Sequence, residues 1–490
     1  MNSPLALSEP RGAQLRETHS GVVILIGDRA YKVKKPVDLG FLDFRTEQAR
    51  HRACEREFQL NRRLAPDVYL DVAELRGSDG NALEHVLVMR RMPEDRRLST
   101  LIANGEDVGD YLDALAELIA RFHRGAARGE AIARAGRATA LQDRWRNNLT
   151  ETERFRGSIL DAQLHEDIAR LALRYVDGRS VLLDQRADAG YVVDGHGDLI
   201  AEDIFCLPDG PRVLDCLEFD DALRWVDVLD DVAFLAMDLE HLGHAELAAR
   251  LLRRYGELAG TTPPSSLQHH YVAYRAFVRA KVSCIRAAQG DAQSTTEARA
   301  LADLALRHLQ AGEVRLVLVG GAPGTGKTTL ARTLASQLDA EVLSSDDVRQ
   351  ELSQRERYTA KAKQETYREL LSRAENALAH GRSVVADATW PTESLRELAR
   401  TLGRSTAARI VELECRLPNE LAARRAQLRL ERATGSSEAG ADITRRLAAE
   451  REPWPRAAPL DMASSFEETV ARAERAAEIR PGDPGRTTLP

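Results

Sequence analysis

The chain has 490 residues, of which 43% are hydrophobic and 30% charged. This composition is typical of globular domains, and at roughly 100–200 residues per domain there is room for two to four of them. The formal net charge of −7 argues against an extended nucleic-acid or membrane surface. Apolar runs such as 22–26 and 316–319 are far shorter than the ~20 residues of a membrane span.

The N-terminus and the cysteines bear on the compartment in which the protein is expected, the cytoplasm. Residues 1–20 carry no basic-then-apolar signal pattern, and the five cysteines include no C-x-x-C pair. We therefore expect a cytoplasmic protein without a disulfide framework or a structural zinc site.

Lysine is scarce, because only seven of the 69 basic residues are lysines. Where arginine supplies most of the positive charge, we expect the remaining lysines to concentrate where the chemistry needs an ammonium group. Lys361 and Lys363 are assigned only to surface charge, and no role is assigned to Lys35 and Lys281. The seven lysines are Lys32, Lys34, Lys35, Lys281, Lys327, Lys361 and Lys363.

In chain order, the pattern of the first half predicts a strand, a turn and a second strand, followed by a mixture of helices and strands. Residues 190–222 are rich in short apolar strands separated by Gly, Asp and Pro, and 228–310 are mostly helical with a break at Pro263-Pro264. The expected strands are 22–26, 30–34, 84–92, 191–193, 204–207 and 213–217, and the expected helices are 46–64 and 109–127.

The pattern restarts at residues 314–319, where an apolar strand runs directly into glycines. Further strands at about 341–344, 383–387 and 409–414 alternate with helices, which indicates a parallel α/β unit. The sequence thus combines an α+β half with an α/β half. We expect domains at 1–310 and 311–480 and a loose tail at 481–490.

Residues 316–330, LVLVGGAPGTGKTTL, match the phosphate-binding pattern G-x-x-x-x-G-K-[ST] between a strand and a helix. Glycines let backbone N–H groups surround phosphates, the lysine adds a mobile charge, and the following hydroxyl ligates Mg²⁺. The sequence therefore predicts binding of ATP and Mg²⁺. The predicted nucleotide-binding residues are Gly321, Gly324, Thr325, Gly326, Lys327, Thr328 and Thr329, with Thr328 also a metal ligand.

Two later strand ends carry acidic residues. Asp346 follows the second strand of this half, where it can accept a proton from an attacking hydroxyl while Arg349 holds the substrate. Helix capping by Ser-Ser-Asp-Asp is the alternative interpretation. Asp387 ends an apolar strand, as a carboxylate that orients Mg²⁺ does.

Arg425 and Arg429 lie four residues apart on one predicted helix, together with Arg424 and Arg432. They either form a lid over the transferred phosphate or belong to a solvated helix. Together these motifs resemble small P-loop kinases of the polynucleotide 5′-kinase, gluconate kinase and zeta-toxin type over about residues 313–455. The resemblance implies that Asp346 is the base that activates the acceptor hydroxyl.

In the first half, HGDLIAED at 196–203 precedes LDCLE at 214–218. The spacing resembles the H-G-D-x-x-x-x-N loop and metal-binding Asp of aminoglycoside phosphotransferases and other protein-kinase-like enzymes. It implies a bilobal kinase-like domain with Asp198 as base and with Asp203 and Asp215 as Mg²⁺ ligands, although Asp203 replaces the usual Asn. We expect His196 to bond to backbone. An acidic helix start at 227–231 either braces this loop or caps a helix.

A lysine on a strand that pairs with a helix Glu holds the ATP phosphates in kinase-like folds. Lys32 with Glu57 is the assignment here, with Lys34 and Glu55 as alternatives, and an edge strand guarded by lysines is the structural alternative. No G-x-G-x-x-G precedes this strand.

Nearly the whole chain resembles bacterial bifunctional aminoglycoside phosphotransferase/ATP-binding proteins. The resemblance implies a two-domain phosphotransferase that moves the γ-phosphate of ATP to a hydroxyl of a small-molecule acceptor. The net charge argues against a nucleic-acid partner, and no membrane partner is expected. Two alternatives stay open: an ATP-binding regulatory protein with a degenerate N-terminal kinase domain, and a polynucleotide 5′-hydroxyl kinase. The sequence identifies neither the acceptor nor the oligomeric state.

Overall fold

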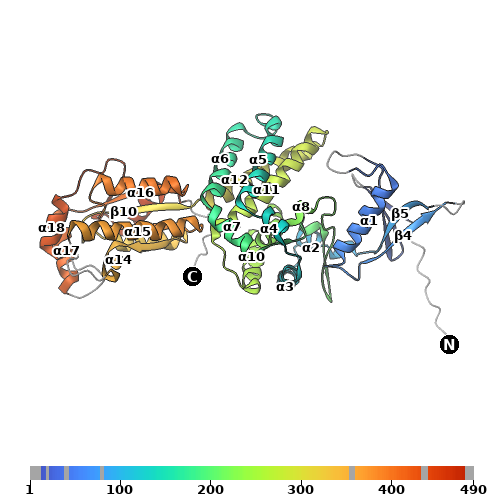
Figure 1. Cartoon of the computed structure of the whole chain (residues 1–490), viewed down its shortest axis with the longest axis horizontal. Helices are drawn as coiled ribbons and strands as arrows, with labels where there is room; N and C mark the ends of the chain where they lie inside the picture. Colours follow the sequence, from blue (N-terminus) through green and yellow to red (C-terminus); the bar gives the residue numbers. More distant parts are fainter. Residues whose placement is uncertain are drawn as a thin grey trace. The chain divides into compact units, whose positions relative to one another are not determined.

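The computed structural model describes residues 13–17, 21–37, 43–77, 82–352, 359–431 and 440–479. The chain divides into two compact units (Figure 1). The first comprises Met1–Gly136 with Ala189–Thr262, and the second Arg137–Asp188 with Pro263–Pro490. The expected tail at 481–490 lies outside the described residues, and the domain boundary at residue 310 stays a prediction.

The first unit contains a five-stranded antiparallel sheet in the order β1-β2-β3-β5-β4. The expected hairpin is confirmed: Ile26 pairs with Arg29 across a turn in which Gly27 has a φ of 56°. Helix α1 (Glu47–Asn61) packs against β4 and β5 and begins at Thr46, whose side chain accepts from the Ala49 N–H. The strands are β1 (Gln14–Glu17), β2 (Gly21–Ile26), β3 (Arg29–Lys34), β4 (Tyr69–Arg76) and β5 (Ala82–Arg90).

The rest of this unit is helical, with two short antiparallel pairs, β6–β9 and β7–β8. The expected strand at 213–217 is wrong beyond Val213, because Asp215 has a φ of 61°, which no strand accommodates. The helices are α2 (Leu98–Ala103), α3 (Gly109–Gly125), α4 (Glu130–Ala135), α8 (Asp221–Arg224), α9 (Val228–His241) and α10 (Ala245–Ala259). The strands are β6 (Val192–Asp194), β7 (Ile204–Leu207), β8 (Gly210–Val213) and β9 (Trp225–Asp227).

The second unit contains a five-stranded parallel sheet in the order β11-β12-β10-β13-β14, so the expected α/β pattern is confirmed. All six residues of β10 are buried, and apolar residues of α13 and α19 pack on one face of the sheet. The strand β14 is not expected from the sequence. The strands are β10 (Arg315–Gly320), β11 (Glu341–Ser344), β12 (Val384–Asp387), β13 (Arg409–Arg416) and β14 (Ala458–Asp461). The helices are α13 (Lys327–Leu338), α14 (Ser345–Glu351), α15 (Ala360–Ala379), α16 (Glu393–Ser405), α17 (Asn419–Glu431), α18 (Ala441–Ala449) and α19 (Phe466–Ala476).

A layer of five further helices completes the second unit, with α11 against α12 and α6 against both α5 and α12. Its core is aromatic: the fully buried Trp145 stacks on Phe277 and donates from Nε1 to His270 Nε2 at 3.1 Å. The helices are α5 (Ala138–Thr152), α6 (Ala162–Gly178), α7 (Ser180–Asp188), α11 (Ser265–Ala288) and α12 (Ala292–Ala311).

Arg179 joins this helical layer to the parallel-sheet layer. Its guanidinium, 1% exposed, donates to Leu378 O at 2.6 Å and to Thr406 O, the carbonyls at the C-terminal ends of α15 and α16. Nearby, Ser266 Oγ donates to Gly381 O at 2.7 Å. Burial lowers the pKa of Arg179 to about 10, so the group stays charged at neutral pH. One buried cation thus adds a charged donor to two carbonyls at helix ends, of which Leu378 O also accepts from the Gly381 N–H at 3.0 Å.

We expect the replacement Arg179→Ala to destabilise the second unit by about 2–4 kcal/mol, since it leaves two buried carbonyls without a charged donor. Urea unfolding followed by circular dichroism measures the change. Arg170→Ala on the same helix α6 is the control, because the side chain of Arg170 is 55% exposed. Equal stability of the two variants would contradict the structural role of Arg179.

Candidate functional sites

The loop between β10 and α13 is shaped by glycines in backbone conformations that other residues avoid. Gly321, Gly324 and Gly326 have φ values of 149°, 80° and 96°. A Cβ at Gly321 would lie 2.7 Å from Cys415 O, and one at Gly324 would collide with Ala422 O. These conformations and close contacts require glycine, and the loop leads into the start of α13, where the helix dipole favours an anion.

Side chains of the loop hold it in shape and supply its charge. Thr325 Oγ1 donates to Ala322 O at 2.8 Å, and Lys327 Nζ donates to the same carbonyl at 3.1 Å. Thr329 is exposed one residue after Thr328 and is not among the residues that line the adjoining pocket.

Thr328 and Asp387, the two expected metal ligands of this unit, touch each other. Thr328 Oγ1 donates to Asp387 Oδ2 at 2.6 Å, because Asp387 ends the strand β12 that pairs with β10. Burial raises the pKa of Asp387. A hydroxyl and a buried carboxylate at one point are oxygen donors of the kind that Mg²⁺ takes together with nucleotide phosphates, so these residues fit the ion.

Asp346 and Arg349 lie on α14, directly after β11. Arg349 donates to Asp346 Oδ1 at 2.6 Å, so the arginine orients the carboxylate. The capping hydroxyl belongs to Ser344, whose Oγ accepts from the Asp346 N–H at 3.2 Å. Capping therefore leaves the Asp346 side chain available to the pocket.

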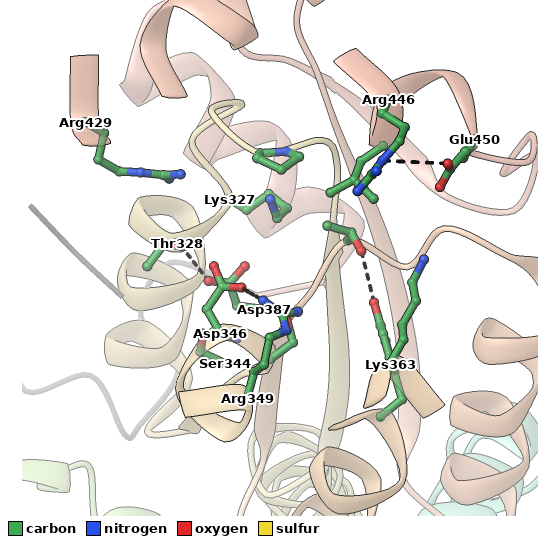
Figure 2. Close-up of a pocket in the computed structure, with 15 residues that line it drawn as sticks. Lys327, Thr328, Ser344, Asp346, Arg349, Lys363, Asp387, Arg429, Arg446 and Glu450 are labelled. Atoms are coloured by element: carbon green, nitrogen blue, oxygen red, sulfur yellow. Dashed lines mark hydrogen bonds and ion pairs between the residues drawn. The ribbon is translucent and has the colours of Figure 1, made fainter. Parts of the chain in front are cut away.

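The parallel sheet brings these residues to one pocket of about 270 Å³ (Figure 2). Arg429 lines it, whereas Arg425 is exposed and is not among the lining residues, and Arg432 lies outside the described residues. The lining residues are Pro323, Lys327, Thr328, Ser344, Ser345, Asp346, Arg349, Lys363, Tyr367, Asp387, Thr389, Arg429, Arg446, Leu447 and Glu450.

Several of these lining residues were missed by reasoning from the sequence, namely Lys363, Tyr367, Arg446 and Glu450. The assignment of Lys363 to surface charge alone is wrong, because the side chain is half-buried and lines the pocket. The scarcity of lysine was the signal that could have found it. Lys361, two residues earlier on α15, is exposed.

In the first unit, Lys32 lies at the centre of a charged cluster. Its Nζ is 2.7 Å from Glu57 Oε1 and 2.8 Å from Asp215 Oδ1. Burial alone would lower the pKa of Lys32, but the charges of Asp215 and Glu57 outweigh it and raise the pKa well above its ordinary value. Glu57 is fully buried, and its two lysine neighbours hold its pKa below the ordinary value against the effect of burial.

Lys34 shares Glu57 with Lys32. Its Nζ lies 2.6 Å from Glu57 Oε2 and 2.5 Å from Glu218 Oε1, and it is 2% exposed. Glu55 instead lies 3.6 Å from His51. The edge-strand alternative is wrong, because β3 lies between β2 and β5. The phosphate-binding role of Lys32 stays a prediction.

The three acidic residues of the expected catalytic segment lie close together. Burial and the nearby charges of Asp215 and Asp198 raise the pKa of Asp203 well above its ordinary value. Asp215 occupies its left-handed backbone conformation because the Tyr69 hydroxyl accepts from its N–H at 3.2 Å and Asn61 Oδ1 accepts from the Cys216 N–H at 2.8 Å. Asp203 is half-buried beside the charge of Asp215, and two carboxylates at this place fit a divalent cation, whose charge offsets their repulsion.

Asp231 braces the loop that carries Asp198. Its carboxylate accepts from the His196 and Gly197 N–H groups, both at 2.8 Å, and from His123 Nε2 at 3.0 Å. Burial lowers the pKa of His196 to about 4, and the neutral ring donates from Nε2 to Leu214 O at 3.1 Å. His196 thus has the backbone role that the sequence suggested. Asp227 is the helix cap, accepting from the Leu229 N–H.

Within the described parts of the chain, no group of three or more His, Cys, Asp or Glu is arranged to hold a metal ion. Of the helices that these residues form, none has both the length and the apolar character required to cross a membrane.

Two family models match the chain. Residues 27–267 match the family described as "Phosphotransferase enzyme family", and residues 316–454 match the family described as "AAA domain". Among solved structures, a choline/ethanolamine kinase family protein from Mesorhizobium loti covers 62% of this chain and 94% of its own, at 16% identity and a TM-score of 0.37. A gluconokinase from Sinorhizobium meliloti 1021 covers 34% of this chain and 91% of its own, at 15% identity and a TM-score of 0.28.

A relative in sequence spans both matches. Uncharacterized protein Rv2004c of Mycobacterium tuberculosis (strain H37Rv) is 42% identical over 471 residues, which are 94% of this chain and 94% of that protein. Uncharacterized protein Mb2027c of Mycobacterium bovis has the same identity and coverage. The chain therefore belongs to the family of these mycobacterial proteins, with an N-terminal phosphotransferase domain followed by a C-terminal P-loop kinase domain.

Proposed function

We propose that the P-loop domain transfers the γ-phosphate of ATP to a hydroxyl of a small molecule. One observation carries this proposal: the phosphate-binding loop, the Thr328–Asp387 pair and Asp346 all meet in a single pocket. Phosphoryl transfer needs these parts together, namely a phosphate cradle, oxygen ligands for Mg²⁺ and a base beside the acceptor.

In the proposed reaction, the acceptor oxygen bonds to the γ-phosphorus as the bond from that phosphorus to the β,γ-bridging oxygen breaks, which releases ADP. Asp346 takes the proton that the acceptor hydroxyl loses, while Arg349 keeps its carboxylate in place. Lys327 and Arg429 neutralise charge on the transferring group. Mg²⁺, when bound beside Thr328 and Asp387, polarises the phosphate oxygens.

We propose a second, kinase-like transfer site in the first unit. Lys32, oriented by Glu57, binds the phosphates of ATP, and Asp198 accepts the proton of a second hydroxyl acceptor. Asp203 and Asp215 would hold Mg²⁺, and the half-buried position of Asp203 near other carboxylates supports that role, since a nearby cation stabilises its charge. Lys34 and Glu218 fix the geometry of Glu57 and of the segment after Asp215.

For the P-loop site, we expect Lys327→Ala to weaken binding of a non-hydrolysable ATP analogue and to lower ADP release by roughly 100-fold or more, because the mobile charge on the phosphates is lost. Calorimetry and a coupled ADP assay measure this in an Asp198→Asn background, which removes the contribution of the other site. The acceptors tested are sugars, amino sugars, nucleosides and 5′-hydroxyl oligonucleotides. The exposed Lys361→Ala is the matched control. Unchanged binding and turnover in a folded Lys327→Ala variant would refute the proposal.

For the first unit, Asp198→Asn should lower phosphate transfer about 10²–10⁴-fold, the usual contribution of a positioned base, without lowering the melting temperature. The assay follows transfer in a Lys327→Ala background. Asp231→Asn is the informative contrast: it should lower the melting temperature, since Asp231 accepts three buried hydrogen bonds. If Asp198→Asn leaves ADP release intact, the first unit only binds nucleotide and serves a regulatory role.

A further inference from the structure

The pocket of the P-loop domain carries more positive charge than the proposed transfer uses. Five of its lining residues are basic and three are acidic. In the proposed reaction, Lys327 and Arg429 face the transferring phosphate. Asp387 faces the metal, and Asp346 faces the acceptor hydroxyl. Arg349 pairs with Asp346, so the two remaining basic residues, Lys363 and Arg446, have no part in the reaction.

Lys363 is held in a position that is unfavourable for a free ammonium group. Its side chain is half-buried, and its Nζ has no hydrogen-bond or ion-pair partner among the described residues. Burial lowers the pKa of Lys363, and the charges of Arg349 and Arg446 lower it further while Glu450 partly compensates. An ammonium removed from water beside like charges is stabilised by an anion that binds between them.

The arrangement in the pocket places these charges on the acceptor side. Figure 2 shows Lys363, Arg446 and Glu450 on the opposite side of the pocket from Thr328 and Arg429, with Asp346 between the two groups. Lys363 comes from α15 and Arg446 from α18, so two separate helices direct positive charge to one place. Glu450 lies 4.0 Å from the exposed Arg446 and offsets only one of the two charges.

We propose that the phosphate acceptor of this domain is a small hydroxyl compound that carries an oxyanion, either a carboxylate or a phosphate, and that Lys363 and Arg446 bind this group while the hydroxyl faces Asp346. This inference rests on the proposed function for the identity of the site as a transferase. Lys363 is then the specificity-determining residue that distinguishes an acidic acceptor from its neutral counterpart.

The test titrates matched acid and neutral compounds into the full chain loaded with Mg²⁺ and a non-hydrolysable ATP analogue. The pairs are gluconate with sorbitol, glycerol 3-phosphate with glycerol, and ribose 5-phosphate with ribose, so that carboxylate and phosphate are separate arms. We expect at least one acid to bind more tightly than its neutral partner. Lys363→Met should weaken that binding about 10- to 100-fold, the usual effect of losing a hydrogen bond to a charged group.

Lys361→Met is the matched control, because Lys361 is exposed two residues away on the same helix. The proposal is overturned if no acid binds, if neutral partners bind as tightly, or if Lys363→Met leaves acid binding unchanged. It is also overturned if Lys363→Met weakens binding of the ATP analogue instead, since the lysine would then belong to the nucleotide site. ADP release with the same compounds tests the proposed function separately. If acids bind in a way that depends on Lys363 but no phosphate is transferred, the proposed transferase function is refuted and the anion-binding site is retained.

Discussion

The parallel pairing of β10 with its neighbours is the constraint on which the P-loop site depends. Parallel strands present their carboxyl ends at the same edge of a sheet, and the register sets Val319 opposite Asp387 and Asp387 opposite Ser344. The phosphate-binding loop, the buried carboxylate and the start of α14 therefore meet without any long-range loop having to fold over them. The hydrogen bond from Thr328 to Asp387 and the position of Asp346 both follow from this register.

In the first unit, charged side chains are buried in sets whose charges compensate one another. Glu57 forms ion pairs with Lys32 and Lys34, and these lysines also form ion pairs with Asp215 and Glu218, respectively. The Asp231 carboxylate accepts hydrogen bonds from two backbone N–H groups and from His123. His123 Nδ1 in turn lies 2.8 Å from the Tyr255 hydroxyl. Buried charges persist only with such partners, so each network fixes the geometry of the loop it touches.

Arg179 applies the same principle to packing within the second unit, where a buried cation binds the carbonyl ends of two helices of the parallel-sheet layer. The helices α15 and α16 precede β12 and β13, the two strands that flank β10. The helical layer therefore contacts the parallel-sheet layer at the ends of α15 and α16, the helices that lead into β12 and β13. Lys281, for which the sequence suggested no role, serves within the helical layer, 2.9 Å from Glu151.

The sequence by itself determined the local features whose signal lies in consecutive residues. Three such features were predictable: the glycines around Lys327, the apolar strands that end at Asp387 and near Asp346, and the Gly27-Asp28 hairpin. They were predictable because backbone conformation and strand period depend on only a few consecutive residues. Only the tertiary structure decided which separate segments meet. It decided that Lys34 and Lys32 share Glu57 and that Asp231 holds the loop before Asp198. It also decided that Lys363 lines the same pocket as Asp346. A lysine on an amphipathic helix looks the same in sequence whether it faces water or a pocket, and only the packing of the helix against its neighbours decides between the two.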